Sequence, residues 1–280
     1  MKTKRILFNI ILLSICACQP STGQDKEARA HQKEGEEKPT AYEAFSSNLA
    51  DTAIARGFTT DYIMGRFDPA KHPDFTLVDA RYADREGLYL RKDTYEAFLR
   101  MYEAAKKEGI NLVIRSATRN FDYQKGIWER KWTGAQAIED GKDASKAYPN
   151  PKDRALKILE YSSMPGTSRH HWGTDMDLNA FTNEYFEKGE GLKIYQWLTA
   201  HAPEYGFCQP YSPKGEERPY GYNEEKWHWS YLPVAQPLTA LAKEKLKDEM
   251  ITGFKGAEVA EEIGVVQKYV LGINTDCLPQ

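Results

Sequence analysis

Residues Ser168–Asp177 read SRHHWGTDMD and place His170 and Asp177 seven residues apart. Gly173 lies between them and offers a place for the chain to bend. A strand on each side of that bend would bring the imidazole and the carboxylate together, and both are groups that zinc accepts as ligands. Asp175 lies two residues before Asp177, and only one of these carboxylates needs to point into such a site.

A second short stretch, Glu225–Trp229, reads EKWHW and places Glu225 three residues before His228. A catalytic zinc site usually has three protein ligands and a water, whose pKa the metal lowers to about 7. A carboxylate close to the metal but not bound to it can act as general base. Taken alone, each stretch could reflect chance spacing or core packing. Together they supply two histidines, an aspartate and a further glutamate, which is a complete set for hydrolysis.

The remaining histidines have simpler interpretations. His31 and His72 are expected on the surface, and His201, near the end of a predicted helix, can interact favourably with the helix dipole. His171 points away from its neighbour His170 if the segment is extended, so we leave it out of the site.

The two stretches resemble motifs of the VanY-type D-alanyl-D-alanine carboxypeptidases. Residues 168–177 are similar to S-x-H-x-x-G-x-A-x-D and residues 225–228 to E-x-W-H. Upstream, residues 116–124 (SATRNFDYQ) resemble S-G-Y-R-S-x-x-x-Q. The three occur in the family's order, over roughly residues 81–231. The resemblance implies the zinc-peptidase fold that these enzymes share with VanX dipeptidases and Hedgehog-like domains.

Three positions depart from the motifs. Asp175 stands where the family usually has Ala, and Ala117 and Thr118 stand where Gly and Tyr are common. They lie between the functional positions, so they bear on substrate preference more than on the metal.

The resemblance implies roles for the matching residues. His170, Asp177 and His228 would bind Zn²⁺. Glu225 would take a proton from the activated water and deliver it to the leaving amine. Arg119 would meet the substrate carbonyl or carboxylate, because a guanidinium offers a rigid fork of donors for such oxygens.

Three further polar residues would form the substrate site: Gln124, Ser168 and Ser116. Gln124 and Ser116 would supply hydrogen bonds, and Ser168 would contact substrate or brace its loop. The alternative is that Arg119 and Gln124 are surface residues at the start of a helix, and that the serine only caps a turn.

The N-terminal segment predicts export. Basic residues within Met1–Arg5 precede the apolar run Ile6–Ile15, which is shorter than the roughly 20 residues that span a bilayer but matches a signal-peptide core. The following Ile15–Cys18 resembles a lipoprotein signal. Cys18 is the better lipidation site, since the small Ala17 precedes it; the alternative is an ordinary secretory signal. Both place the protein outside the cytoplasm, and the first anchors it to a bacterial membrane.

The remaining cysteines, Cys208 and Cys277, would be in a compartment that permits disulfides. A bridge and two separate thiols are both compatible with the sequence. A bridge would close a loop of about 70 residues and stabilise the fold by about 4 kcal/mol in the chain-entropy model.

The segment pattern favours an α+β fold, with a small antiparallel sheet flanked by helices. Helices are expected over Thr94–Glu108, from Asn120 onward, and over Lys152–Tyr161, Gly191–Ala202, Leu238–Glu249 and Glu258–Leu271; strands are expected over Asn111–Ile114, Thr174–Leu178 and Lys226–Tyr231. Asp93 and Glu96 are expected to form a capping box for the first helix, with Gly109 as its stop. In the second strand, Met176 and Leu178 would face away from Asp177.

We expect four parts along the chain: a signal peptide (1–17), a charged flexible tether (18–41), the zinc peptidase domain (42–232) and a helical C-terminal extension (233–280). The formal net charge of −3 is too close to neutral for a nucleic-acid binder. No periodic face is decisive for an oligomer, so the sequence leaves the oligomeric state open.

The expected activity is hydrolysis of the terminal D-Ala-D-Ala bond in peptidoglycan stem peptides. Alternatives are a peptidase that cuts an L,D-bond or an internal crosslink, a non-catalytic peptidoglycan-binding lipoprotein, and a lipoprotein with a structural zinc. Glu225 argues against a pure binder, which needs no base. Three ligands without a nearby cysteine argue against a closed structural site.

Overall fold

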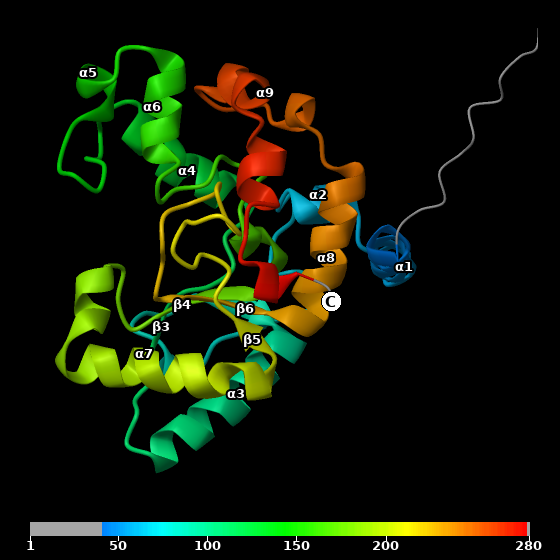
Figure 1. Cartoon of the computed structure of the whole chain (residues 1–280), viewed down its shortest axis with the longest axis vertical. Helices are drawn as coiled ribbons and strands as arrows, with labels where there is room; N and C mark the ends of the chain where they lie inside the picture. Colours follow the sequence, from blue (N-terminus) through cyan, green and yellow to red (C-terminus); the bar gives the residue numbers. More distant parts are fainter. Residues whose placement is uncertain (1–40, 279–280) are drawn as a thin grey trace, which may run out of the picture. The chain divides into compact units, whose positions relative to one another are not determined.

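The computed structural model describes residues 41–278 (Figure 1). The signal peptide, the tether up to residue 40 and the lipidation of Cys18 therefore lie outside the described residues. Within 41–278, no helix has the length and apolar character needed to cross a bilayer. These residues belong to one compact unit.

A four-stranded antiparallel sheet lies at the centre. Its order is β3 (Ile114–Ser116), β4 (Asp175–Leu178), β6 (His228–Tyr231) and β5 (Phe207–Cys208). The register places Asp177 opposite Ser116 on one side and opposite His228 on the other. A separate antiparallel pair joins β1 (Phe75–Leu77) and β2 (Tyr89–Arg91). The expected α+β class with a small antiparallel sheet is confirmed.

The expectation of a strand over Asn111–Ile114 is wrong, because pairing begins only at Ile114. Asn179, directly after β4, has a φ of 61° and turns the chain out of the sheet. Its backbone N–H and side chain bond instead to Val113. The residues before Ile114 therefore have no strand beside them.

One face of the sheet is covered by α3 (Lys92–Lys107) and α7 (Gly189–His201), below the strands in Figure 1. Met176 and Leu178 of β4 pack into this core, as expected from the alternation along the strand. In α7 the inward residues include Ile194 and Trp197, whereas Leu192 and Tyr195 are only half-buried. Near the start of α7, Gly191 packs directly against the backbone of Tyr185, where a Cβ atom would clash with the carbonyl oxygen.

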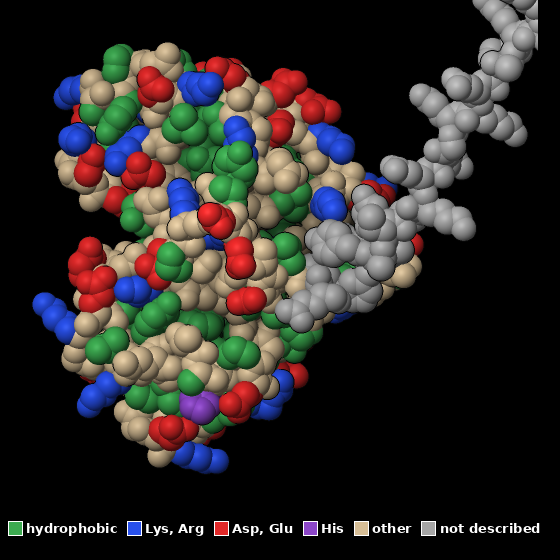
Figure 2. Space-filling model, viewed as in Figure 1, with side chains coloured by type: hydrophobic (Ala, Val, Ile, Leu, Met, Phe, Trp, Pro, Cys, Tyr) green, Lys and Arg blue, Asp and Glu red, His purple; other side chains and the backbone are tan. Residues whose placement is uncertain are grey.

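The other face carries a larger core formed by helices from both halves of the chain. They are α1 (Ala41–Ala55), α2 (Thr60–Ile63), α4 (Phe121–Trp132), α5 (Ala144–Ala147), α6 (Pro151–Ile158), α8 (Leu232–Lys245) and α9 (Ala260–Ile263). The surface is hollowed between α4–α6 and the segment before α7, at the left of Figure 2.

Short helical turns complete the described chain. They are η1 (Ala80–Tyr82), η2 (Arg169–Trp172), η3 (Asn183–Glu187), η4 (Ala202–Tyr205), η5 (Asp248–Met250), η6 (Ala257–Val259), the π-helical turn η7 (Val266–Val270) and η8 (Thr275–Cys277).

Two helix starts illustrate local rules. Asn120 caps α4 by accepting from Tyr123 N–H at 2.9 Å, and the helix begins directly after it, where a helix was expected to start. The capping box expected at Asp93 is wrong, because α3 begins at Lys92 and its cap position, Arg91, makes no side-chain capping hydrogen bond. The Asp93 carboxylate instead pairs with the buried guanidinium of Arg91 at 3.2 Å. Gly109, with a φ of 75°, does follow the end of the helix.

The C-terminal region differs from the two long helices expected. The first, α8, starts six residues earlier, with Pro233 in its first turn, and ends at Lys245. The helix expected over Glu258–Leu271 is broken into η6, α9 and η7, because Gly264 adopts a φ of 72°. The helix expected over Lys152–Tyr161 also ends early, at Ile158.

The chain forms the disulfide Cys208–Cys277, which resolves the two alternatives left open by the sequence. It joins β5 to η8, sixty-nine positions later. Leu238, Val270 and Ile273 from the C-terminal region lie in the same core as Trp172. This region is therefore packed into the fold that carries the site.

Candidate active site

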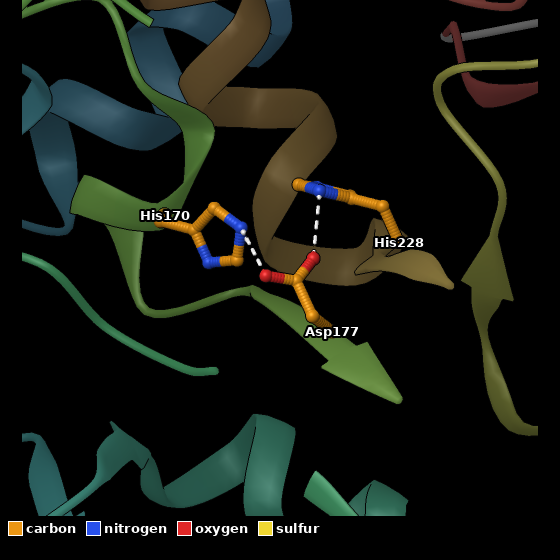
Figure 3. Close-up of side chains that lie close together, drawn as sticks. All are labelled: His170, Asp177 and His228. Carbon is orange, nitrogen blue, oxygen red and sulfur yellow. Dashed lines mark ion pairs between the residues drawn. The ribbon is translucent and has the colours of Figure 1, made fainter. Parts of the chain in front are cut away.

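Three elements bring His170, Asp177 and His228 together (Figure 3). Asp177 and His228 are direct neighbours across the β4–β6 ladder. His170 lies on η2, so the strand expected before the bend is wrong. A helical turn followed by Gly173, with a φ of 74°, brings the chain back into β4.

The geometry of the three residues fits a bound cation. His170 Nε2 lies 3.3 Å from Oδ2 of Asp177, and His228 Nδ1 lies 3.2 Å from Oδ1. One ligand atom of each residue lies within 4.8 Å of the others, and all three side chains are buried. Among the described residues, Oδ1 of Asp177 finds no hydrogen-bond donor. Two imidazoles and a carboxylate are a donor set that suits zinc.

The outer nitrogen of each histidine is held by an acceptor. Nδ1 of His170 lies 2.9 Å from the carbonyl oxygen of Ala117, and Nε2 of His228 lies 2.8 Å from Oδ2 of Asp175. Such partners orient a metal-binding imidazole and select the nitrogen that faces the metal. The inner nitrogens are thus Nε2 of His170 and Nδ1 of His228.

Electrostatics favour positive charge at this point. Burial by itself lowers the pKa of His228, but the carboxylates of Asp175, Asp177 and Glu225 outweigh it and raise the pKa well above its usual value. Burial raises the pKa of Asp177, but His170 and His228 outweigh it and lower the pKa well below the usual value. The pocket can therefore accommodate a cation between ionised carboxylates.

Glu225 lies beside the three residues without belonging to the set of candidate ligands. Its Oε2 is 3.3 Å from Nδ1 of His228, and burial raises the pKa of its carboxyl above the usual value. A carboxylate with a raised pKa next to a metal site is suited to exchange a proton with a reacting group.

The site opens into a cleft of about 700 Å³. Its lining includes His170, Asp177, Glu225, Arg119 and Trp227. Cavities of this size hold small molecules and short peptides.

Arg119 is held at the cleft through its backbone. Its N–H donates to the carbonyl oxygen of His170 at 3.2 Å. Its buried Nε has no hydrogen-bond partner in the part of the chain that the structure describes. This donor can therefore serve a ligand.

The expected substrate residues divide into two groups. Ser116 lines the cleft. Gln124 and Ser168 are absent from the described lining and are almost fully buried behind it, with exposures of 1% each. Gln124 donates to the carbonyl oxygen of Ser163 at 2.8 Å, so the alternative of a surface glutamine is wrong. The substrate contacts of all three stay predictions.

Two residues near the site were missed by the sequence analysis. Asp175 lies behind His228, so Asp175 and Asp177 contact opposite nitrogens of its ring. The signal was their spacing, because residues two apart on a strand share a face. His171 braces the loop: its Nδ1 contacts the carbonyl oxygen of Arg119 and its Nε2 accepts from Gly166 N–H at 3.0 Å.

A comparison with models of protein families shows to which family the chain belongs. The VanY model, described as D-alanyl-D-alanine carboxypeptidase, matches residues 87–234, more than half of the chain. The chain belongs to the VanY family. The matched region contains the three candidate ligands, Glu225 and Arg119.

Curated VanY-like relatives are moderately similar. YodJ of Bacillus subtilis (strain 168), named provisionally as a carboxypeptidase, is 29% identical over 174 residues, covering 60% of this chain and 55% of its own. A D-alanyl-D-alanine carboxypeptidase of Enterococcus faecalis (strain ATCC 700802 / V583) is 26% identical over 134 residues, covering 48% and 45%. The chain thus spans about half the length of these relatives.

A solved VanY structure is also similar. VanYB in complex with D-alanine-D-alanine has 20% sequence identity and a TM-score of 0.46, covering 63% of this chain and 87% of that one.

Proposed function

We propose that this VanY-family protein is a zinc-dependent D-alanyl-D-alanine carboxypeptidase acting on the stem peptides of peptidoglycan. One observation carries the proposal: ligand atoms of His170, Asp177 and His228 converge within 4.8 Å, next to a cleft whose lining includes His170, Asp177 and Glu225. The donor set suits zinc, and Glu225 remains as a base outside the candidate ligands.

Glu225 and Arg119 have different roles in the proposed hydrolysis. When bound, zinc supplies Lewis acidity that polarises the substrate carbonyl and makes water nucleophilic near neutral pH. Glu225 accepts the proton from the attacking water and transfers it to the leaving amine. Arg119 presents a donor that has no hydrogen-bond partner among residues 41–278 to the carbonyl or to the terminal carboxylate of the peptide.

We further propose that the protein acts outside the cytoplasm, held at a bacterial membrane by lipid on Cys18. The apolar segment before Cys18 supports export. The Cys208–Cys277 disulfide supports an oxidising compartment. Replacing Cys18 by Ser should release the protein from the membrane fraction; continued membrane attachment would contradict the lipid anchor.

The experiment combines metal analysis with peptide hydrolysis, with and without a chelator. A pentapeptide ending in D-Ala-D-Ala is compared with the tetrapeptide ending in one D-Ala and with a crosslinked muropeptide. We expect one zinc per chain and chelator-sensitive D-Ala release from the pentapeptide. Cleavage of only the tetrapeptide or the crosslinked muropeptide would show that the enzyme cuts a different peptidoglycan bond from the one proposed. Zinc without any cleavage would favour a binding protein, and a chain without zinc would overturn the proposal.

A further inference from the structure

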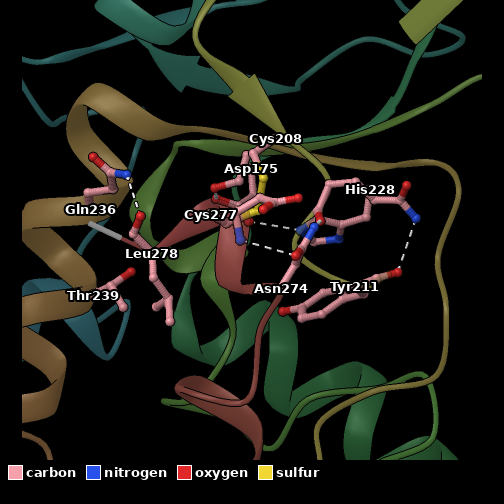
Figure 4. The surroundings of a disulfide bond; sticks show 12 residues. Asp175, Cys208, Tyr211, His228, Gln236, Thr239, Asn274, Cys277 and Leu278 are labelled. Atoms are coloured by element: carbon pink, nitrogen blue, oxygen red, sulfur yellow. Dashed lines mark hydrogen bonds and ion pairs between the residues drawn. A yellow bond between two sulfur atoms is a disulfide. The ribbon is translucent and has the colours of Figure 1, made fainter. Parts of the chain in front are cut away.

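Asp175 contacts His228 from the ring nitrogen opposite the candidate metal. Its side chain is fully buried, and its Oδ2 lies 2.8 Å from Nε2 of His228 (Figure 4). The β4–β6 register creates this contact, because it places Asp175 opposite Ser230 and Asp177 opposite His228. The two aspartates share a strand face and reach the two nitrogens of one imidazole.

A buried arginine neutralises this carboxylate. Nε of Arg169 lies 3.1 Å from Oδ2 of Asp175, and its guanidinium carbon lies 4.5 Å from the ring centroid of Trp172. The hydroxyls of Ser230 and Thr174 donate to Oδ1 of Asp175 at 2.7 and 2.6 Å. Both carboxylate oxygens thus have partners, as a buried charge requires.

The same arginine connects the site to the C-terminal region. Its Nη1 donates to Oγ1 of Thr239 on α8 at 3.0 Å, and its Nη2 donates to Oγ of Ser230 on β6 at 2.8 Å. Thr239 in turn donates to the carbonyl oxygen of Ala235. The network therefore links α8 to the strand that carries His228.

We propose that Asp175 and Arg169 are a positioning pair that fixes the orientation of His228 and thereby sets the affinity of the site for its cation. The proposal rests on the metal site described above. A carboxylate only accepts hydrogen bonds, so its contact requires the proton of neutral His228 on Nε2 and leaves the lone pair of Nδ1 directed at the ligand cluster. Arg169 cancels the charge of Asp175, so Asp177 remains the charged ligand.

Asp175 is one of the positions that depart from the motif resembling that of VanY enzymes. Such positions were expected to bear on substrate preference more than on the metal, but Asp175 contacts a candidate ligand. The chain thus supports its second histidine ligand with a contact that the motif does not contain. The unprotonated ring nitrogen is selected by the sheet register and the buried ion pair together.

The test compares folded variants by their affinity for a cation. Asp175→Ala removes the contact, whereas Asp175→Asn keeps an oxygen that can accept from Nε2. Asp175→Ala combined with Arg169→Met also removes the buried cation that would be left unpaired. Asp93→Ala is the matched control, because it takes a carboxylate from the buried guanidinium of Arg91, outside the ligand cluster.

Cobalt(II) titration followed by visible absorption, with chelator competition for zinc, reports the site without turnover. We expect Asp175→Ala to bind both cations about 10–100-fold more weakly, with an altered cobalt spectrum. Asp175→Asn should recover most of the affinity. The double variant should recover thermal stability but not affinity, and Asp93→Ala should bind as the wild type does.

Wild-type affinity and spectrum in folded Asp175→Ala would overturn the inference, as would full recovery of affinity in the double variant. If the wild type binds neither cobalt nor zinc, both the proposed metal site and this inference are wrong. If it binds both but Asp175→Ala is unchanged, only this inference falls.

Discussion

Nδ1 of His228 lies 3.2 Å from Oδ1 of Asp177, and the two residues are directly opposite each other on β6 and β4. Two of the three candidate ligands are therefore held by backbone pairing in the central sheet. His170 joins them from η2, where its carbonyl also accepts from the N–H of Arg119. The backbone of Arg119 is therefore hydrogen-bonded to a residue of the ligand cluster.

Replacing His228 by Ala should abolish stoichiometric zinc binding, because two ligands rarely hold zinc in a protein site. Metal analysis of the purified, folded variant checks this. His201→Ala is the control, since His201 is exposed and pairs with Glu204 outside the site. Full zinc occupancy in His228→Ala would break the proposed ligand set.

Replacing Glu225 by Gln should leave zinc bound and lower kcat by about 10²–10⁴-fold, the usual contribution of a general base. Steady-state kinetics with parallel metal analysis measure this. Glu224→Gln, at the neighbouring and more exposed position, should retain activity. Near-normal turnover of Glu225→Gln would remove the proposed base.

The pH profile should carry the signature of the same carboxyl. Burial raises the pKa of Glu225, and a base must be ionised, so activity should fall on acidification at a higher pH than for an exposed glutamate. Profiles of kcat/KM for the zinc-loaded protein check this. The residual activity of Glu225→Gln should not show this fall at acidic pH. If the fall is unchanged in the variant, it is caused by another titrating group.

Replacing Arg119 by Ala should lower kcat/KM by about 10–100-fold, as expected for losing a charged hydrogen bond of about 1.5–3 kcal/mol. Arg119→Lys should recover part of the lost kcat/KM, because lysine keeps the positive charge but lacks the planar fork of guanidinium donors. Arg100→Ala, an exposed position on α3, is the control. A kcat/KM of Arg119→Ala equal to that of the wild type would show that Arg119 does not contribute to catalysis or substrate binding.

Removing the Cys208–Cys277 bridge should reduce the free energy of unfolding by about 4 kcal/mol, because it closes a long loop. Urea unfolding of the double serine variant measures the loss. Reduction of the wild type should reproduce it, whereas a reducing agent should leave the double variant unchanged. Equal stability of oxidised wild type and variant would contradict the prediction.

Buried His171 should make stability depend on pH. Burial lowers its pKa to about 3, compared with about 6.5 in the unfolded chain. The folded state therefore binds fewer protons between these values, so the free energy of unfolding should fall as pH falls below 6.5, by up to about 1.4 kcal/mol per pH unit. Urea unfolding of wild type and His171→Gln between pH 7.5 and 5 isolates this contribution; parallel curves would exclude it.

The sequence was most informative where local chemistry decides the outcome. Asn120 is a good helix cap, and Met176 and Leu178 alternate with Asp177, so α4 and the faces of β4 follow from short-range rules. Where tertiary contacts compete with local preference, the expectations fail. Asp93 binds Arg91 and does not cap α3, and Val113 bonds to Asn179, where the chain leaves β4, and not to a neighbouring strand.

The candidate ligands, Glu225 and Arg119 could be named from spacing and from the VanY resemblance, because the types of side chain needed for hydrolysis are written in the sequence. Only the tertiary structure decided that Asp175 also reaches His228 and that Gln124 lies buried behind the cleft. It also decided the pairing of the two late cysteines. The physical reason is that strand register and core packing bring together residues distant in sequence, and neither is encoded in any one short stretch.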